Sequence, residues 1–142
     1  MTSAQIARVR ESWTLLLPIA ATFASDFYRA LFVLDPSLQR LFAHSDAVSQ
    51  QRKLMQTLTV VVASLDDIDA LVPALEALAR RHVGYGALDA HYDLVGQALI
   101  ATIAAALGAR FDDQTREAWE AVYATLARVM RRAAIASSPR VS

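Results

Sequence analysis

The chain has 142 residues, of which 55% are hydrophobic and 20% are charged, so its length suits one domain with a sizeable apolar core. Its 14 basic and 14 acidic residues balance, which argues against a nucleic-acid-binding surface, because such surfaces normally carry a basic excess. The absence of cysteine excludes disulfides, thiolate metal sites and cysteine nucleophiles. The N-terminus lacks the basic start and apolar run of a signal peptide, and no apolar stretch approaches the length of a membrane span. These features predict a cytoplasmic protein with no membrane or nucleic-acid partner.

The pattern of apolar residues predicts helices along almost the whole chain. Apolar positions recur at helical spacing, and four glycines and four prolines are too few for an all-β fold. The first helix is expected to start at a Ser3 cap and to break at Pro18, and Asp35-Pro36 is expected to begin a short turn. The sequence therefore predicts one all-α domain, residues 1–142, of about seven helical segments. The other expected helices cover about 19–34, 48–65, 71–84, 89–107 and, from a cap at Asp112 or Asp113, the remaining chain to a frayed tail at about 137.

His82 is the most informative of the three histidines. It shares a helical stripe with Leu75, Leu78 and Ala79, so its imidazole faces an apolar interior. A buried imidazole must form hydrogen bonds or bind something, because its nitrogens are otherwise unsatisfied. A single histidine is a good axial ligand for haem iron and leaves the opposite position open for a gas. The alternative is a core histidine bonded to a backbone carbonyl, and the stripe alone leaves both open.

Three segments resemble the globin family, in particular bacterial single-domain haemoglobins and flavohaemoglobins. The proximal region of those proteins is similar to LARRHVGYGALDAHYDLVGQALI (78–100), and their second helix is similar to FYRALF (27–32). Their distal helix resembles SQQRKLMQTL (49–58), here in the R-K-L-M order of neuroglobin-type sequences. The resemblance implies a three-over-three helical sandwich around a haem b. It implies that His82 is the proximal iron ligand and Tyr28 the distal tyrosine.

The same resemblance assigns the distal helix. It implies Gln50 at the distal polar position, Lys53 at the pocket edge and Leu54 over the iron. A shift by one residue would bring Gln51 and Met55 to the haem instead. We prefer Gln50 and Leu54 because they lie four residues apart on one face that continues inward. No histidine lies in this segment, so bis-histidine ligation from it is not expected.

The implied pocket combines an apolar lining with a charged rim. Haem is a flat, mostly apolar disc with two carboxylates along one edge, and burial of the disc would follow from the hydrophobic effect. At the rim, either Lys53 or Arg81 would pair with a propionate, although an exposed lysine without a partner is the plain alternative. For each apolar residue the alternative is ordinary core packing. The expected apolar lining is Phe42, Leu54, Leu78, Val95 and Leu99.

The residues that the resemblance places on the two sides of the haem predict reversible binding of diatomic gases. Tyr28 and Gln50 would donate hydrogen bonds to oxygen at the iron, which predicts high oxygen affinity, slow release and a smaller gain for carbon monoxide. Tyr92, ten residues after His82, matches a proximal-side tyrosine that pairs with a glutamate in bacterial haemoglobins. The corresponding stretch of the last helix, RVMRRAAIA (128–136), contains no acidic residue. Because that pair makes the imidazole more anionic and favours oxygen activation, its absence points toward gas binding.

The sequence leaves four functions open. The first is an oxygen-binding globin for transport, storage or scavenging, with nitric oxide and carbon monoxide as further ligands. The second is a nitric oxide dioxygenase that takes electrons from a separate reductase, because no reductase domain follows in this sequence. A haem-based sensor is less expected because no output domain follows. The fourth is a helical interaction module that binds no haem. For such a module we expect no haem absorption band.

Overall fold

The computed structural model describes residues 1–42, 46–84 and 89–137, and within these ranges the chain is almost entirely helical and has no strand. The expected all-α architecture is therefore confirmed. The loop expected around residue 44 and most of the expected tail lie outside the described residues. In chain order the elements are α1 (Ser3–Leu16), the 3-10 helix η1 (Leu17–Ile19), α2 (Ala20–Leu34), the 3-10 helix η2 (Pro36–Phe42), α3 (Ala47–Ala63), α4 (Ile68–Gly84), α5 (Asp89–Leu107), the 3-10 helix η3 (Gly108–Arg110) and α6 (Asp113–Ser137).

The first helix begins one residue earlier than expected. Thr2, rather than Ser3, caps α1, because the Thr2 hydroxyl accepts the backbone N–H of Gln5 at 3.1 Å. The Gln5 side chain in turn accepts the backbone N–H of Thr2 at 3.0 Å. This reciprocal capping box satisfies donors that the first turn leaves without partners inside the helix.

Aspartate caps set the starts of two later helices. Asp67 accepts the backbone N–H of Ala70 at 3.4 Å, and α4 therefore begins directly after it, earlier than the expected start near Leu71. Asp112 accepts the backbone N–H of Thr115 at 2.8 Å, so it is the cap of α6 among the two aspartates considered. A carboxylate at this position is favoured by both the free N–H groups and the helix dipole.

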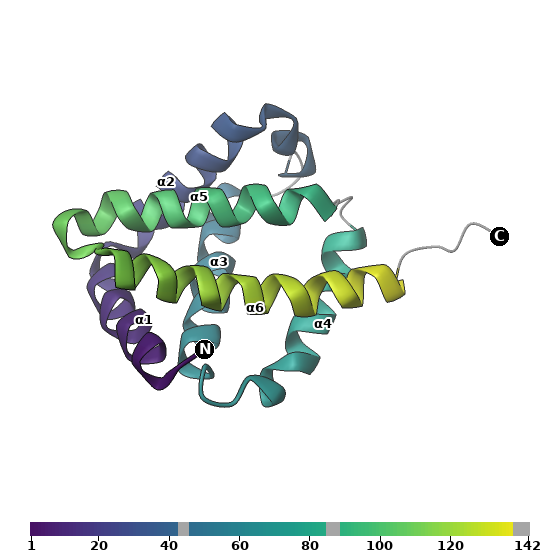
Figure 1. The fold of residues 1–142 in the computed structure, drawn as a ribbon. Coiled ribbons are helices and arrows are strands. Elements are labelled where there is room, and N and C mark those ends of the chain that lie inside the picture. The colour runs from purple at the N-terminus through teal and green to yellow at the C-terminus, as the bar shows by residue number, and fades with distance from the viewer. Residues whose placement is uncertain (43–45, 85–88, 138–142) are drawn as a thin grey trace.

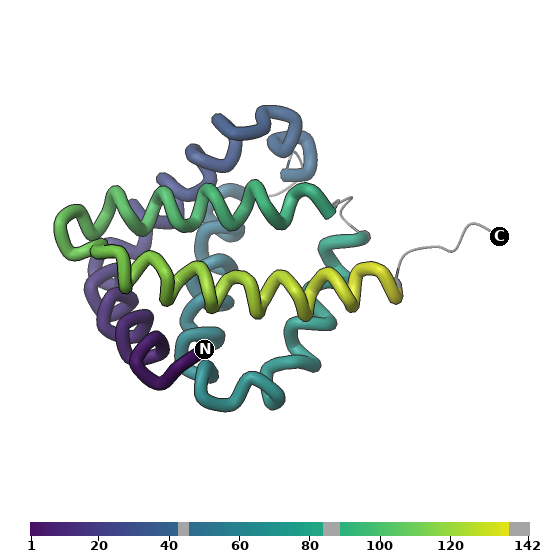
Figure 2. Tube along the Cα trace, viewed as in Figure 1, coloured from purple at the N-terminus to yellow at the C-terminus, as the bar shows by residue number. Residues whose placement is uncertain are grey.

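The helices pack in two crossed layers. Helices α5 and α6 run side by side across one face of the molecule, and the other helices lie behind them (Figure 1). Helix α1 packs mainly against α6, α2 against α5 and α3, and α4 against α6. The trace in Figure 2 shows α4 passing behind the C-terminal part of α6. This crossed arrangement is the expected three-over-three helical sandwich.

The core forms where α1, α2, α5 and α6 meet. The ring of Trp13 lies 6.4 Å from Phe23 in an edge-to-face arrangement and 6.3 Å from Trp119. The indole N–H of Trp119 donates to the Ser12 hydroxyl at 2.8 Å, so this buried polar pair is satisfied. The largest fully buried side chains are Trp119, Phe23, Leu16, Ile103 and Val9.

Two helical stretches, Ser3–Leu34 and Asp89–Arg110, are long and apolar enough to cross a membrane by length and composition alone. In that respect the expectation that no stretch approaches a membrane span is wrong. Core helices of compact proteins meet the same test. Here both stretches bury apolar side chains in the core, among them Phe23, Leu31 and Ile103. The apolar window of the first stretch is 28% buried and that of the second is 39% buried, so each stretch has a buried side and an exposed side.

The helices that carry the predicted haem residues pack against different neighbours. Helix α3 carries Gln50 and packs mainly against α2 and α1, whereas α4 carries His82 and packs mainly against α6. Helix α2 carries Tyr28 and contacts both α3 and η2, which ends at Phe42. The predicted distal residues thus come from α2, η2 and α3, and the predicted proximal residue comes from α4.

Candidate haem-binding site

The side chain of His82 is held by a carbonyl of its own helix. His82 lies near the end of α4 and is half-buried, and its Nδ1 lies 2.7 Å from the backbone oxygen of Leu78, one turn earlier. A carbonyl oxygen can only accept a hydrogen bond, so Nδ1 carries a proton and donates it to Leu78. Metal-ligating histidines commonly donate their second N–H to a carbonyl in this way, which fixes tautomer and orientation. The donor chemistry of His82 therefore fits an axial ligand of haem iron.

The surroundings of His82 bear on which metal group would fit. A core histidine would form the same bond to Leu78, so the bond alone does not distinguish the two alternatives. Within the described residues, no group of three or more His, Cys, Asp or Glu side chains is placed to hold a metal ion. Haem iron is the candidate metal because the resemblance to globins implies it, and a porphyrin supplies further ligands.

On the distal side, the structure brings Tyr28, Gln50 and Phe42 together. The Tyr28 hydroxyl donates to the backbone oxygen of Gln50 at 3.3 Å. Its ring lies 5.6 Å from Phe42 in an edge-to-face arrangement, and Phe27 and Phe32 complete the aromatic cluster. Burial in this cluster raises the pKa of Tyr28 to about 12, because a phenolate would be poorly solvated there. Tyr28 therefore stays a protonated donor throughout the physiological pH range.

The two glutamines of α3 have different neighbours. Gln50 supplies the oxygen that Tyr28 contacts. Gln51 and Met55 instead line a groove of about 770 Å³ between α2 and α3. Gln50 and Leu54 are both half-buried and remain the predicted distal pair.

The charged residues predicted for the rim are exposed. Lys53 on α3 and Arg81 on α4 are both exposed, and neither belongs to an ion pair within the described part of the chain. Either cation is accessible to a propionate, and the choice between them stays a prediction. The predicted apolar lining is half-buried except for Leu99, which is 5% exposed. The half-buried members are Phe42, Leu54, Leu78 and Val95.

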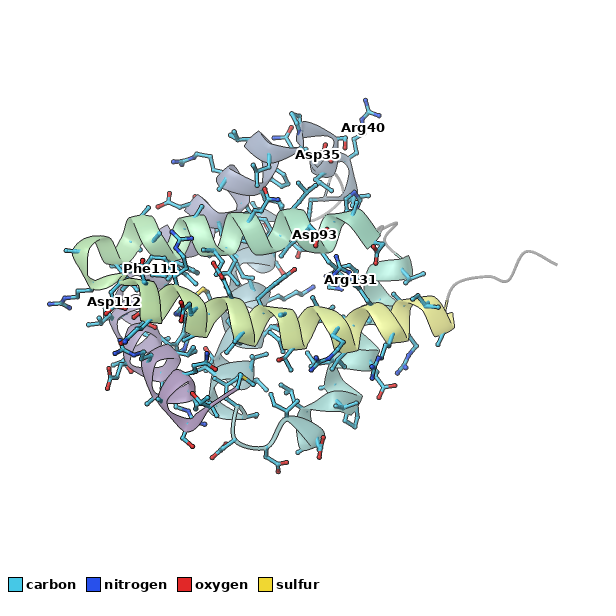
Figure 3. The ribbon with its side chains drawn as sticks, viewed as in Figure 1. Asp35, Arg40, Asp93, Phe111, Asp112 and Arg131 are labelled. Atoms are coloured by element: carbon cyan, nitrogen blue, oxygen red, sulfur yellow. The ribbon has the colours of Figure 1, made fainter. Side chains whose placement is uncertain are left out.

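Tyr92, predicted to support the proximal histidine, is buried in the first turns of α5. It is 8% exposed, and its hydroxyl has no hydrogen-bond partner within the described residues. The Arg131 guanidinium lies 5.5 Å from the centre of its ring, and the Tyr123 hydroxyl donates to its backbone oxygen. Burial raises the pKa of the Tyr92 hydroxyl, and the positive charge of Arg131 opposes that rise. The resemblance implies a glutamate near the end of the last helix, and from that helix, α6, the structure brings the cation Arg131 to the Tyr92 ring (Figure 3).

Tyr123 and Arg131 were missed by the sequence analysis. They lie eight residues apart on α6 and so share a face, as do Asp89 and Asp93, four residues apart on α5. The stretch around Arg131 holds three arginines and resembles a solvated helix face. The shared face of each pair is the only signal in the sequence, and it does not show which residues of α6 meet α5.

Comparisons with known proteins identify the family. The globin family profile matches residues 25–130. A flavohemoprotein of Bordetella parapertussis is 34% identical over 103 residues, which cover 71% of this chain and 26% of that protein. A flavohemoprotein of Deinococcus radiodurans is 31% identical over 132 residues, which cover 92% of this chain and 33% of that protein. The chain thus spans a third or less of the length of these relatives.

A solved structure shows the same fold. The bacterial globin from Campylobacter jejuni matches with a TM-score of 0.84 over 95% of this chain and 97% of that chain, at 22% sequence identity. At this identity the likeness concerns the fold. The family profile covers well over half of the chain, and it includes the positions of Tyr28, His82 and Tyr92. The chain belongs to the globin family.

Proposed function

We propose that this globin reversibly binds oxygen, with nitric oxide and carbon monoxide as alternative ligands, at a haem b whose iron is held by His82. The observation that carries the proposal is the position of His82 within the matched globin profile, with its Nδ1 held by the Leu78 oxygen in the way common among metal-ligating histidines. Haem held by a single histidine supplies an iron with one axial position open to a small gas. The similarity to flavohemoproteins supports a haem cofactor.

Tyr28 is the proposed main contact for the gas. Its protonated hydroxyl lies in an otherwise aromatic cluster, and its bond to the Gln50 oxygen is long, at 3.3 Å. Exchange of that bond for one to a partly charged ligand therefore costs little. Hydrogen bonds to charged groups contribute about 1.5–3 kcal/mol. The side-chain amide of Gln50 is the proposed second donor.

Residues at the edge and in the lining of the pocket orient the cofactor. Lys53 or Arg81 pairs with a propionate, and both are exposed as such a role requires. Phe42, Leu54 and Val95 contribute apolar contacts. These contacts hold the disc but give little chemical selectivity among gases.

The test is the absorption spectrum of the purified protein in its ferric, reduced and carbon monoxide-bound states. We expect a Soret band and a five-coordinate ferrous form. His82→Gly should lose the histidine-ligated spectrum and regain it with added imidazole, whereas His91→Ala serves as the matched control and should retain it. An unchanged spectrum in His82→Gly would overturn the assignment of the ligand. A protein made with ample haem but lacking any Soret band would be a haem-free module.

A second candidate function is nitric oxide dioxygenation with electrons from a separate reductase. The observation in its favour is the similarity to flavohemoproteins, of which this chain matches a third or less. The cation beside Tyr92 supports the gas-binding function instead, because an anionic proximal side favours oxygen activation. Rapid mixing with nitric oxide and a reducing system separates the two. A carrier stalls after one turnover, whereas a dioxygenase continues.

A further inference from the structure

Arg131 joins the end of α6 to the first turn of α5. Its Nε lies 3.1 Å from Asp89 Oδ1 and its Nη2 lies 2.8 Å from Asp93 Oδ1, so one guanidinium holds two carboxylates one turn apart. The Arg131 side chain is 30% exposed, whereas the two carboxylate side chains are 76% and 71% exposed. The Arg131 side chain is therefore more buried than the two carboxylates that it binds. Figure 3 shows Arg131 and Asp93 between the two helices, and we call Arg131, Asp89 and Asp93 the Arg131 clasp.

Helix α6 holds Tyr92 at both its ring and its backbone. The Arg131 guanidinium lies over the ring, 5.5 Å from its centre, a geometry in which the ring face attracts a cation. The Tyr123 hydroxyl donates to the Tyr92 backbone oxygen. The Tyr123 ring also packs on Gly96, where a Cβ would come within 2.7 Å of Tyr123 Cε2. The absence of a side chain at Gly96 is thus what allows α6 to approach α5 here.

The hydroxyl of Tyr92 is the part of this residue that lacks a partner. It is buried, and no group within the described residues accepts or donates a hydrogen bond to it. Burial of a hydroxyl without a partner is unfavourable, so the ring and backbone contacts with α6 are what hold Tyr92 in place. Helix α6 packs against both α4, which carries His82, and α5, which carries Tyr92. The shared neighbour of the two helices is therefore the helix that carries Arg131.

We propose that Arg131 is a positioning residue of the proximal side, which fixes Tyr92 and places a positive charge against its ring. The inference rests on the proposed function and concerns the electronic character of its axial ligand. Of the three charged side chains in the Arg131 clasp, that of Arg131 is the least exposed, so its charge is the least screened by water. With haem bound at His82, a cation on this side would disfavour an imidazolate-like ligand and favour the reduced iron.

The test measures the midpoint potential and the ferrous iron–histidine stretching frequency of the haem-loaded protein. Arg131→Met keeps the length and loses the charge, and we expect the ferrous-to-ferric ratio at a fixed ambient potential to fall about threefold. Asp93→Asn removes a negative charge from the same clasp and should move the ratio the other way. Arg131→Lys keeps the charge and should stay near the parent value. Arg128→Met removes an exposed charge from the same helix and should have a smaller effect.

The directions of the two shifts in midpoint potential distinguish an effect of charge from an effect of support of the fold. If Arg131→Met and Asp93→Asn shift the potential in the same direction, the clasp acts only by holding α5 and the proposal is wrong. Equal shifts in Arg131→Met and Arg128→Met would overturn it as well. If Arg131→Met fails to fold, Asp93→Asn and Arg131→Lys still test the direction. Failure of the parent protein to bind haem overturns the proposed function, whereas normal haem binding with unmoved potentials overturns only the role of Arg131.

Discussion

The two sides of the candidate haem site are built from different interactions. The distal side is an aromatic cluster from α2 and η2 in which Tyr28, a neutral hydroxyl, is the polar group that contacts α3. The proximal side has a histidine bonded to its own helix and a buried tyrosine covered by Arg131, with its carboxylate partners exposed. In the proposed function, the neutral donor on one side would stabilise a polar ligand, and the cation on the other would withhold electron density from the iron. Both features would favour holding a gas over reacting with it.

The largest expected effect comes from removal of the Tyr28 hydroxyl. Removal of the Tyr92 hydroxyl is the matched change on the proximal side. Tyr28→Phe should raise the oxygen dissociation rate about tenfold to a hundredfold, because it removes a hydrogen bond to a partly charged ligand. Tyr92→Phe keeps its ring under Arg131 and should change that rate much less, because its hydroxyl acts on the proximal side. Stopped-flow displacement of oxygen by carbon monoxide measures both rates. Equal oxygen dissociation rates in the two variants would show that the Tyr28 hydroxyl has no special role in holding the ligand.

The sequence predicted the helices better than their ends. Helical periodicity located α2 and α5 closely, since Asp35-Pro36 and Gly108 mark their C-terminal limits. The starts of α1 and α4 were misjudged because several polar residues compete for each cap, and backbone geometry decides between them. Such a choice is not visible in the apolar pattern on which the prediction rested.

The contact between Tyr28 and Gln50 was easier to anticipate from the sequence than the contact between Tyr92 and Arg131. Tyr28 and Gln50 lie in segments whose resemblance to globins is local, and the structure brings them into contact. Arg131 lies far along the chain from Tyr92, and three neighbouring arginines fit a solvated helix face. Only the packing of α5 on α6 shows which arginine covers the tyrosine. Contacts between helices distant in sequence are set by packing rather than by local pattern.

A smaller effect is expected at the contact that holds the proximal side together. Gly96→Ala places a Cβ 2.7 Å from the Tyr123 ring and should lower the free energy of unfolding by about 1–3 kcal/mol through overpacking. Chemical denaturation measures the change. In a Tyr123→Ala background the penalty of Gly96→Ala should largely disappear, because the obstructing ring is gone.

Gly108 provides the matched glycine control. It has φ +57° and no atom within 4 Å of the position that a Cβ would take, so Gly108→Ala costs stability through backbone strain alone. That cost should be the same with and without the Tyr123 ring. If the loss of stability in Gly96→Ala is also the same with and without the Tyr123 ring, the close approach of α6 to α5 does not depend on this glycine.

The smallest expected effect is the alkaline stability of the distal side. Tyr28 has a pKa of about 12 in the folded protein against an ordinary value of 10.0, so on raising the pH the unfolded chain loses its proton first. The free energy of unfolding is therefore unaffected by this group below pH 10 and falls as the pH rises from 10 toward 12, by about 1–2 kcal/mol once partial exposure is allowed for.

Denaturant unfolding across that pH range separates the two tyrosines. Tyr28→Phe should flatten the alkaline decline, whereas Tyr92→Phe should flatten it less, because the charge of Arg131 opposes the effect of burial at Tyr92. Arg131→Met should then strengthen the contribution of Tyr92, since it removes the group that lowers the pKa of that hydroxyl. An alkaline decline that is identical in Tyr28→Phe and the parent protein would mean that the distal hydroxyl is solvated. In that case the neutral, dry donor on which the contrast between the two sides depends would be absent.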